Sequence, residues 1–234
     1  GLDEVVVVRF DEGFARLSPE SFCRAVLSAH LGARVVFVGE NFRFGHHGTG
    51  TAADLVEYGS THGFEVQAVS LVEEGGETIS STRIRALLQA GHVREAARLL
   101  GRPHRVEGTV ASGVGRGRGL DAPTANLPAD RDMALPRSGV YATLSTVDGT
   151  EPHPSVTSVG TNPTFESGRK IRVETLLLDY SGDLYGRHLA VDFVDRIRGQ
   201  RSFPDADSLA RQIKDDVAQA RRLHAGASIS KEAS

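Results

Sequence analysis

The chain has 234 residues, of which 39% are hydrophobic and 24% are charged, and its formal net charge is −3. At about 150 residues per domain, this length favours one large domain or two small ones. The sequence contains no run of about 18 apolar residues and no charged-then-apolar leader, so we expect neither a membrane span nor a secretory signal. We therefore expect a cytoplasmic protein. A nucleic-acid partner is not expected, because nonspecific nucleic-acid binders usually carry a basic surplus.

Residues that form disulfides or bind metals give little signal. Cys23 is the single cysteine of the sequence, so an internal disulfide is excluded. It lies in an apolar helical run, which predicts a packing role. The nine histidines show no metal-ligand spacing, since His46 and His47 are adjacent and the others are scattered. The sequence therefore predicts no multi-cysteine or multi-histidine metal site.

In the first part of the chain, short apolar runs alternate with helical stretches. Ser18-Pro19-Glu20 predicts a helix start, because serine caps helices and proline suits the first turn. Alternating strands and helices are typical of parallel βαβ organisation, so an α/β module is expected. The elements expected are an apolar run at residues 5–10, a helix from Ser18 to about Leu31, strands at 34–38 and 64–72 around a helix at 51–58, and two short helices within 80–100.

After Gly101-Arg102-Pro103 the pattern changes to short strand-like runs separated by Gly, Pro, Asn and Asp. This pattern is typical of antiparallel β structure and predicts a barrel-like part. A closing helix is expected from about Asp205, because apolar residues recur there at helical spacing. The strands are expected at residues 106–111, 140–146, 171–178 and 189–194, and the domains at 1–101 and 102–224, followed by a flexible tail at 225–234.

A glycine-rich segment occupies residues 113–119. Alternating glycines let backbone amides approach a phosphate, and the interleaved arginines supply charge. The segment is not a Walker A loop, and Pro123 stands where a Rossmann helix would start. A surface loop between strands is the alternative. The candidate nucleotide-binding residues here are Gly113, Gly115, Arg116 and Gly117.

Two oxygen-bearing side chains follow this segment directly. Thr124 and Asn126 are two residues apart, so in an extended segment they project from one side. Neutral oxygen donors suit Mg²⁺ that carries a nucleotide phosphate. The pair therefore indicates a metal and nucleotide site, with a simple turn as the alternative.

A carboxylate lies within the expected strand at residues 171–178. Strand alternation places Arg172, Glu174 and Leu176 on one face. If Glu174 faced the barrel interior or mouth, it could act as a general base for a hydroxyl nucleophile, as phosphoryl transfer requires. An exposed salt bridge between Arg172 and Glu174 is the alternative.

The first part of the chain carries two further candidate sites. Residues 39–45 follow a buried strand, where open α/β sheets bind ligands, and Phe42 and Phe44 could either hold a flat ring or pack in the core. Residues 80–85 lie at a helix N-terminus, where hydroxyls, free amides and arginines can bind an anion. Helix capping by a serine is the alternative for this second segment.

Taken in order, several motifs resemble one family, the prokaryotic bifunctional riboflavin kinase and FAD synthetase. The resemblance extends from about Leu2 to Leu223, nearly the whole chain. Each motif is weak alone, but their combination and order are specific. The motifs are Ser18-Pro19-Glu20-Ser21-Phe22, residues 39–45, residues 80–85, Leu100-Gly101-Arg102-Pro103, residues 123–126, residues 160–165, Val173-Glu174 and Asp183-Leu184-Tyr185-Gly186.

This resemblance implies an N-terminal FMN adenylyltransferase module of nucleotidyltransferase type. It also implies a C-terminal riboflavin kinase module, a six-stranded antiparallel β-barrel with a C-terminal helix. In the kinase, Thr124 and Asn126 would hold Mg²⁺ and ATP phosphate, the glycine segment would cover the nucleotide, and Glu174 would be the base for the ribityl hydroxyl. The further matches are Ser81, Thr82 and Arg85 to ATP-phosphate contacts, and Asn41, Phe44 and Arg198 to flavin-side positions.

This chain also departs from the family pattern. It has Asp121-Ala122 where the family usually has a Gly-Phe pair, and it lacks the His-x-Gly-His type loop that binds ATP. We therefore expect the chain to start inside the adenylyltransferase module and to keep the kinase activity with weak or absent FAD synthesis, because the missing loop would stabilise triphosphate charge. The expected partners are riboflavin, FMN and ATP, and a homo-oligomer is allowed. The alternative is a noncatalytic flavin-binding or regulatory protein.

Overall fold

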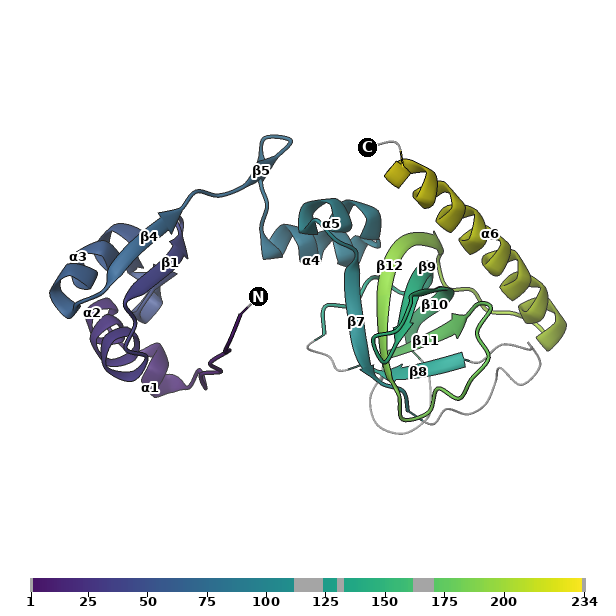
Figure 1. Ribbon diagram of the computed structural model, residues 1–234, viewed down its shortest axis with the longest axis horizontal. Coiled ribbons are helices and arrows are strands. Elements are labelled where there is room, and N and C mark those ends of the chain that lie inside the picture. The colour runs from purple at the N-terminus through teal and green to yellow at the C-terminus, as the bar shows by residue number, and fades with distance from the viewer. Residues whose placement is uncertain (1, 112–123, 130–132, 162–170, 233–234) are drawn as a thin grey trace. The chain divides into compact units, whose positions relative to one another are not determined.

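The computed structural model describes two compact units, Gly1–Ile79 and Ser80–Ser234 (Figure 1). No helix in the described part of the chain is long and apolar enough to cross a membrane. The residues that the structure describes are 2–111, 124–129, 133–161 and 171–232.

The first unit contains a small parallel sheet with helices, which confirms the expected α/β organisation. Strand β1 pairs in parallel with β4, from Val35 opposite Glu65 to Gly39 opposite Val69. Ser18 caps α2 by accepting a hydrogen bond from the Ser21 amide at 3.2 Å. The elements are α1 (Glu12–Ala15), α2 (Pro19–Phe22), the π-helix η1 (Cys23–His30), β1 (Val35–Gly39), β2 (Arg43–Phe44), the 3-10 helix η2 (His46–Gly48), β3 (Gly50–Thr51), α3 (Ala52–His62), β4 (Glu65–Val69), β5 (Glu73–Glu74) and β6 (Glu77–Thr78).

The core of this first unit forms around Cys23, Phe44, Leu55 and Phe64, all of them buried. Burial raises the pKa of the Cys23 thiol to about 11, so the thiol stays protonated at neutral pH. A protonated, buried thiol packs as a small apolar side chain. The packing role expected for Cys23 is therefore confirmed.

The second unit contains a six-stranded antiparallel sheet in the order β7-β12-β9-β10-β11-β8, which confirms the expected strand number. Among the described residues, Ala111, two residues beyond the end of β7, forms a bridge with Asn126 of the other edge strand, β8. This bridge closes the sheet on itself at the position of Asn126. The elements are α4 (Ser81–Ala90), α5 (Val93–Leu100), β7 (His104–Thr109), β8 (Thr124–Pro128), β9 (Gly139–Val147), β10 (His153–Thr161), β11 (Ile171–Leu177), β12 (His188–Arg198) and α6 (Ala206–Glu232).

The two faces of this sheet have different environments. Ala125, Leu127, Val159 and Val173 point inward and belong to the main core cluster. Because side chains alternate along a strand, the residues between them point to the outer face. On that outer face Val140, Ala142 and Val156 pack against Ala220 of α6, while Ser158 and Glu174 lie farther along the same face.

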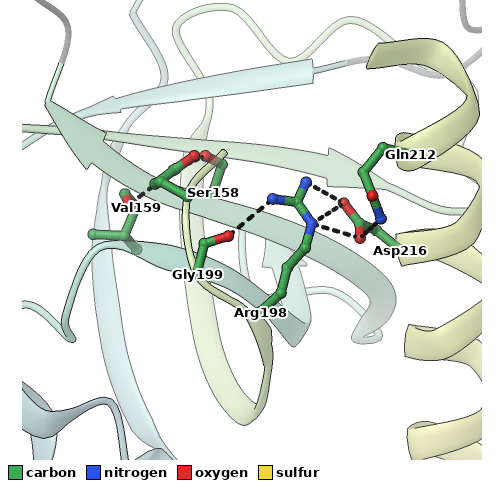
Figure 2. Close-up of polar contacts among 7 residues, drawn as sticks. Ser158, Val159, Arg198, Gly199, Gln212 and Asp216 are labelled. Atoms are coloured by element: carbon green, nitrogen blue, oxygen red, sulfur yellow. Dashed lines mark hydrogen bonds and ion pairs between the residues drawn. The ribbon is translucent and has the colours of Figure 1, made fainter. Parts of the chain in front are cut away.

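Helix α6 lies along strands β9 and β10 (Figure 1), and a buried ion pair attaches it to the end of β12. The Arg198 guanidinium donates from Nη2 to Asp216 Oδ2 at 2.7 Å and from Nε to Oδ1 at 2.9 Å. Gln212 donates to the same carboxylate at 3.0 Å (Figure 2). The side chains of Arg198 and Asp216 are only 12% and 4% exposed, so each charge depends on the other.

The compact units do not coincide with the boundary expected at residue 101. Helices α4 and α5 fall in the second unit, where Leu88 and Val93 belong to the core under the sheet. The division of activities between residues 1–101 and 102–224 stays a prediction, because compactness does not show which residues carry an activity. Helix α6 continues to Glu232, through most of the expected tail at 225–234.

The buried ion pair predicts a large effect of Asp216→Ala on stability. The variant leaves the Arg198 charge buried without a partner, so we expect a loss of about 3–5 kcal/mol in the free energy of unfolding. Urea titration followed by circular dichroism measures this difference.

The chain offers a control in Asp179→Asn, because asparagine keeps the left-handed backbone of this position (φ 56°) and removes the charge. Arg221 of α6 pairs with Asp179 through two hydrogen bonds of 2.8 Å, but these side chains are 51% and 66% exposed. Solvent screens such a pair, so Asp179→Asn should unfold close to the parent. Equal losses in the two variants would contradict the assigned role of the buried pair.

Candidate functional site

One row of residues crosses five adjacent strands on the outer face of the sheet. The register places Arg198 of β12 opposite Val140 of β9, and Val140 opposite Ser158 of β10. Ser158 lies opposite Glu174 of β11, which in turn lies opposite Asn126 of β8. Directly opposed residues point to the same face, so Asn126, Glu174 and Ser158 form a polar cluster.

Thr124 lies in the next row of the same face. It pairs with Leu176, two residues from Glu174, and it stands two residues before Asn126 on β8. The expectation that Thr124 and Asn126 project from one side is therefore confirmed. Both side chains are half-buried. Their hydroxyl and amide oxygens are neutral donors that fit Mg²⁺ bound to the phosphates of a nucleotide.

Glu174 points away from the barrel interior. Its neighbours Val173 and Thr175 are fully buried and point inward, so the Glu174 carboxylate lies on the opposite, outer face. Of the two places considered, the barrel interior is not the one that Glu174 faces, because alternation along β11 assigns that side to Val173. A position at the barrel mouth, and the role of base, stay predictions. In the described part of the chain, Arg172 forms no ion pair with Glu174, so the salt-bridge alternative is not observed.

Arg198 shares the row but stands three strands from Glu174, about 14 Å at the usual spacing of strands. Besides Asp216, its guanidinium donates to the Gly199 carbonyl at 3.0 Å and lies 5.7 Å from the centre of the Phe203 ring. These contacts give Arg198 a structural role between β12 and α6. Its contact with flavin stays a prediction.

Sequence reasoning missed two polar residues: Ser158, which lies opposite Glu174, and Gln200, which bonds to Ser158. The Gln200 amide donates from Nε2 to Ser158 Oγ at 2.9 Å and to the Val159 carbonyl at 3.1 Å. The sequence gives no direct signal for this pair, because strand β10 was not among the expected strands. Only the register shows that Ser158 is the neighbour of Glu174.

The candidates of the first unit have different environments. Asn41 is exposed in the turn after β1. Phe44 is 6% exposed and stacks on Phe42 with ring centres 5.6 Å apart, so the core alternative describes its position. A flavin contact by Phe44 stays a prediction, and one that its burial does not favour.

At the start of α4, a serine caps the helix, which is the alternative given for residues 80–85. Ser80 caps the helix by accepting a hydrogen bond from the Arg83 amide at 3.2 Å. Ser81, Thr82 and Arg85 are exposed on the first turns. Capping by Ser80 leaves these three side chains available, so their contacts with ATP phosphates stay a prediction.

The expected residues of the glycine-rich segment lie outside the described part of the chain. Gly113, Gly115, Arg116 and Gly117 lie outside the described residues, as does Asp121-Ala122. Within the described ranges, no group of three His, Cys, Asp or Glu residues could hold a metal ion. A metal at this site would therefore depend on neutral oxygens and on the phosphates of a nucleotide.

Two family models match successive parts of the chain. The riboflavin kinase family model matches residues 100–224, and the FAD synthetase family model matches residues 1–83. A crystal structure described as a macrolide-efflux protein from Streptococcus pneumoniae has the same fold. Its TM-score is 0.76 at 36% sequence identity, with 91% of this chain and 67% of that chain covered.

Two curated relatives are bifunctional riboflavin kinase/FMN adenylyltransferases. The protein from Escherichia coli (strain K12) is 38% identical over 223 residues, which are 95% of this chain and 71% of that protein. The protein from Pseudomonas fluorescens is 37% identical over 225 residues, 96% of this chain and 72% of that protein. The chain therefore belongs to the family of bifunctional riboflavin kinase/FMN adenylyltransferases, the enzymes of flavin cofactor biosynthesis.

Proposed function

We propose that this chain transfers the terminal phosphoryl group of ATP to riboflavin, with Glu174 as the general base. The observation that carries the proposal is the row on the outer face, where Glu174 stands directly between Asn126 and Ser158. Phosphoryl transfer needs an acceptor for the alcohol proton close to the transferred group. A carboxylate directly opposite the Asn126 side chain meets that need.

The proposed step moves one proton and one phosphoryl group. The terminal ribityl hydroxyl of riboflavin gives its proton to the Glu174 carboxylate while its oxygen bonds to the γ-phosphorus of ATP. The bond from that phosphorus to the bridging oxygen breaks, and ADP leaves with both electrons. The products are FMN, ADP and a protonated Glu174, which returns its proton to solvent.

Thr124 and Asn126 would hold Mg²⁺ and the nucleotide phosphates beside this base. Bound Mg²⁺ neutralises charge on the phosphate oxygens. Orientation of the phosphates by the Thr124 hydroxyl and the Asn126 amide is the contribution of this chain. The glycines of residues 113–117, with Arg116, would supply backbone amides and charge to the same nucleotide.

The second proposed activity joins FMN to the adenylyl group of ATP. A phosphate oxygen of FMN attacks the α-phosphorus, pyrophosphate leaves and FAD forms. Ser81, Thr82 and Arg85 are exposed at the start of α4, where free amides and hydroxyls suit triphosphate oxygens. Asn41 would lie on the flavin side. We propose a cytoplasmic location, because both reactions consume ATP.

Substitution of the base tests the kinase assignment. Glu174→Gln keeps the shape of the side chain but cannot take the proton, so we expect kcat for FMN formation to fall about a hundredfold or more. Chromatography of reactions with riboflavin, ATP and Mg²⁺ measures FMN directly.

Glu107→Gln is the matched control, because Glu107 is an exposed strand residue of β7. It should leave FMN formation unchanged. Near-parent turnover in Glu174→Gln would remove Glu174 from the role of base. Flavin binding by the parent without any product would instead support the noncatalytic alternative.

We expect this chain to make the two flavin products, FMN and FAD, in unequal amounts. The residues proposed for the kinase lie on one continuous sheet, whereas the His-x-Gly-His type loop that the family resemblance associates with ATP binding in FAD synthesis does not occur in this sequence. We therefore expect FMN to accumulate with little FAD. FAD as the main product at every time point would contradict this expectation.

A further inference from the structure

Gln200 is hydrogen-bonded to strand β10 near its end, at Ser158, the residue opposite Glu174, and at Val159. Both N–H groups of its amide are used, one on Ser158 Oγ at 2.9 Å and one on the Val159 carbonyl at 3.1 Å. This position of the Gln200 side chain requires a glycine at residue 160, since a Cβ there would lie 2.8 Å from Gln200 Nε2. Ser158 and Val159 lie next to the segment that continues from Arg198 to Gly199 (Figure 2).

These two contacts determine the direction of the hydrogen bond to Ser158. The Val159 carbonyl can only accept a hydrogen bond, so the amide nitrogen of Gln200, and not its amide oxygen, must face strand β10. The same nitrogen therefore donates to Ser158 Oγ. Ser158 uses its oxygen as an acceptor in this bond, and its own hydroxyl proton stays available for another partner.

On the two strands next to β10, one of the side chains directly opposite Ser158 can accept that proton. On one side Ser158 lies opposite Val140, which is buried and apolar. On the other side it lies opposite Glu174. Directly opposed residues have Cβ atoms about 4.5–5.5 Å apart, a separation that a hydroxyl and a carboxylate can bridge. Glu174 is thus the residue across the strand that can accept from Ser158.

We propose that Ser158 is a positioning residue for Glu174 in riboflavin phosphorylation, and that Gln200 orients the Ser158 hydroxyl by donating to its oxygen. No hydrogen bond joins these two side chains in the described part of the chain without substrate. With riboflavin bound, the Ser158 hydroxyl would donate to one carboxylate oxygen of Glu174, which would restrict the carboxylate so that its other oxygen faces the substrate hydroxyl. The proposal rests on the proposed kinase function. It assigns no substrate contact to Ser158 or Gln200, so both residues act through Glu174.

A pair of variants with the same shape isolates the hydroxyl group. Ser158→Thr keeps the hydroxyl and Ser158→Val removes it, and both β-branched side chains suit a strand. We expect Ser158→Thr to keep kcat within about threefold of the parent. Ser158→Val should lower kcat about tenfold, the factor expected for a hydrogen bond to a charged group. KM for riboflavin and ATP should change less than about twofold.

Gln200→Met gives a second, independent measurement. It removes the amide while keeping the length of the side chain, so it should lower kcat about as much as Ser158→Val. Because the two residues act in series, the double variant should lose little more than either single variant. Melting temperatures of all variants show whether the fold is kept.

The outcomes separate this inference from the function on which it rests. A parent chain that makes no FMN overturns the proposed function and this inference with it. If the parent is active and Ser158→Val matches Ser158→Thr in kcat, only the inference is overturned. A rise in KM at unchanged kcat, or fully additive losses in the double variant, likewise excludes positioning through Glu174.

Discussion

Cross-strand register is the constraint on which the candidate site depends. Asn126, Glu174 and Ser158 come from three separate strands, and they meet because each is directly opposite the next. A slip of one residue in any of these strands would turn its side chains to the other face. Glu174 would then point into the core, and the proposed base and its nucleotide-side neighbour would lie on opposite sides of the sheet.

Buried hydroxyls on the inner face hold this register in place. Thr143 bonds to Ser155 at 2.8 Å and to Thr157 at 2.7 Å, and Thr157 bonds to Thr175 at 3.0 Å. All four are fully buried, so a shifted strand would leave hydroxyls without partners in the core. On the outer face, Ala220 of α6 packs against Val140, Ala142 and Val156 of strands β9 and β10. The position of Glu174 therefore follows from contacts on both faces of the sheet.

The sequence predicts most of this fold but only part of the site. Parallel pairing, the α4 and α5 helices, and the common side of Thr124 and Asn126 follow from local patterns and are confirmed. Strand β10 was missed because its Pro, Ser, Thr and Gly residues lack the alternation of an exposed strand, and Ser158 was missed with it. The outward direction of Glu174 and the core position of Phe44 depend on nonlocal packing, which no local pattern determines.

A crystal structure of this chain with ADP, Mg²⁺ and riboflavin tests the central claim most directly. The account predicts that the terminal ribityl oxygen lies on the outer face of the sheet, within about 3 Å of the Glu174 carboxylate. It also predicts the ADP phosphates on the side of Thr124 and Asn126. A ribityl oxygen out of reach of Glu174, or phosphates bound away from strand β8, would contradict the account.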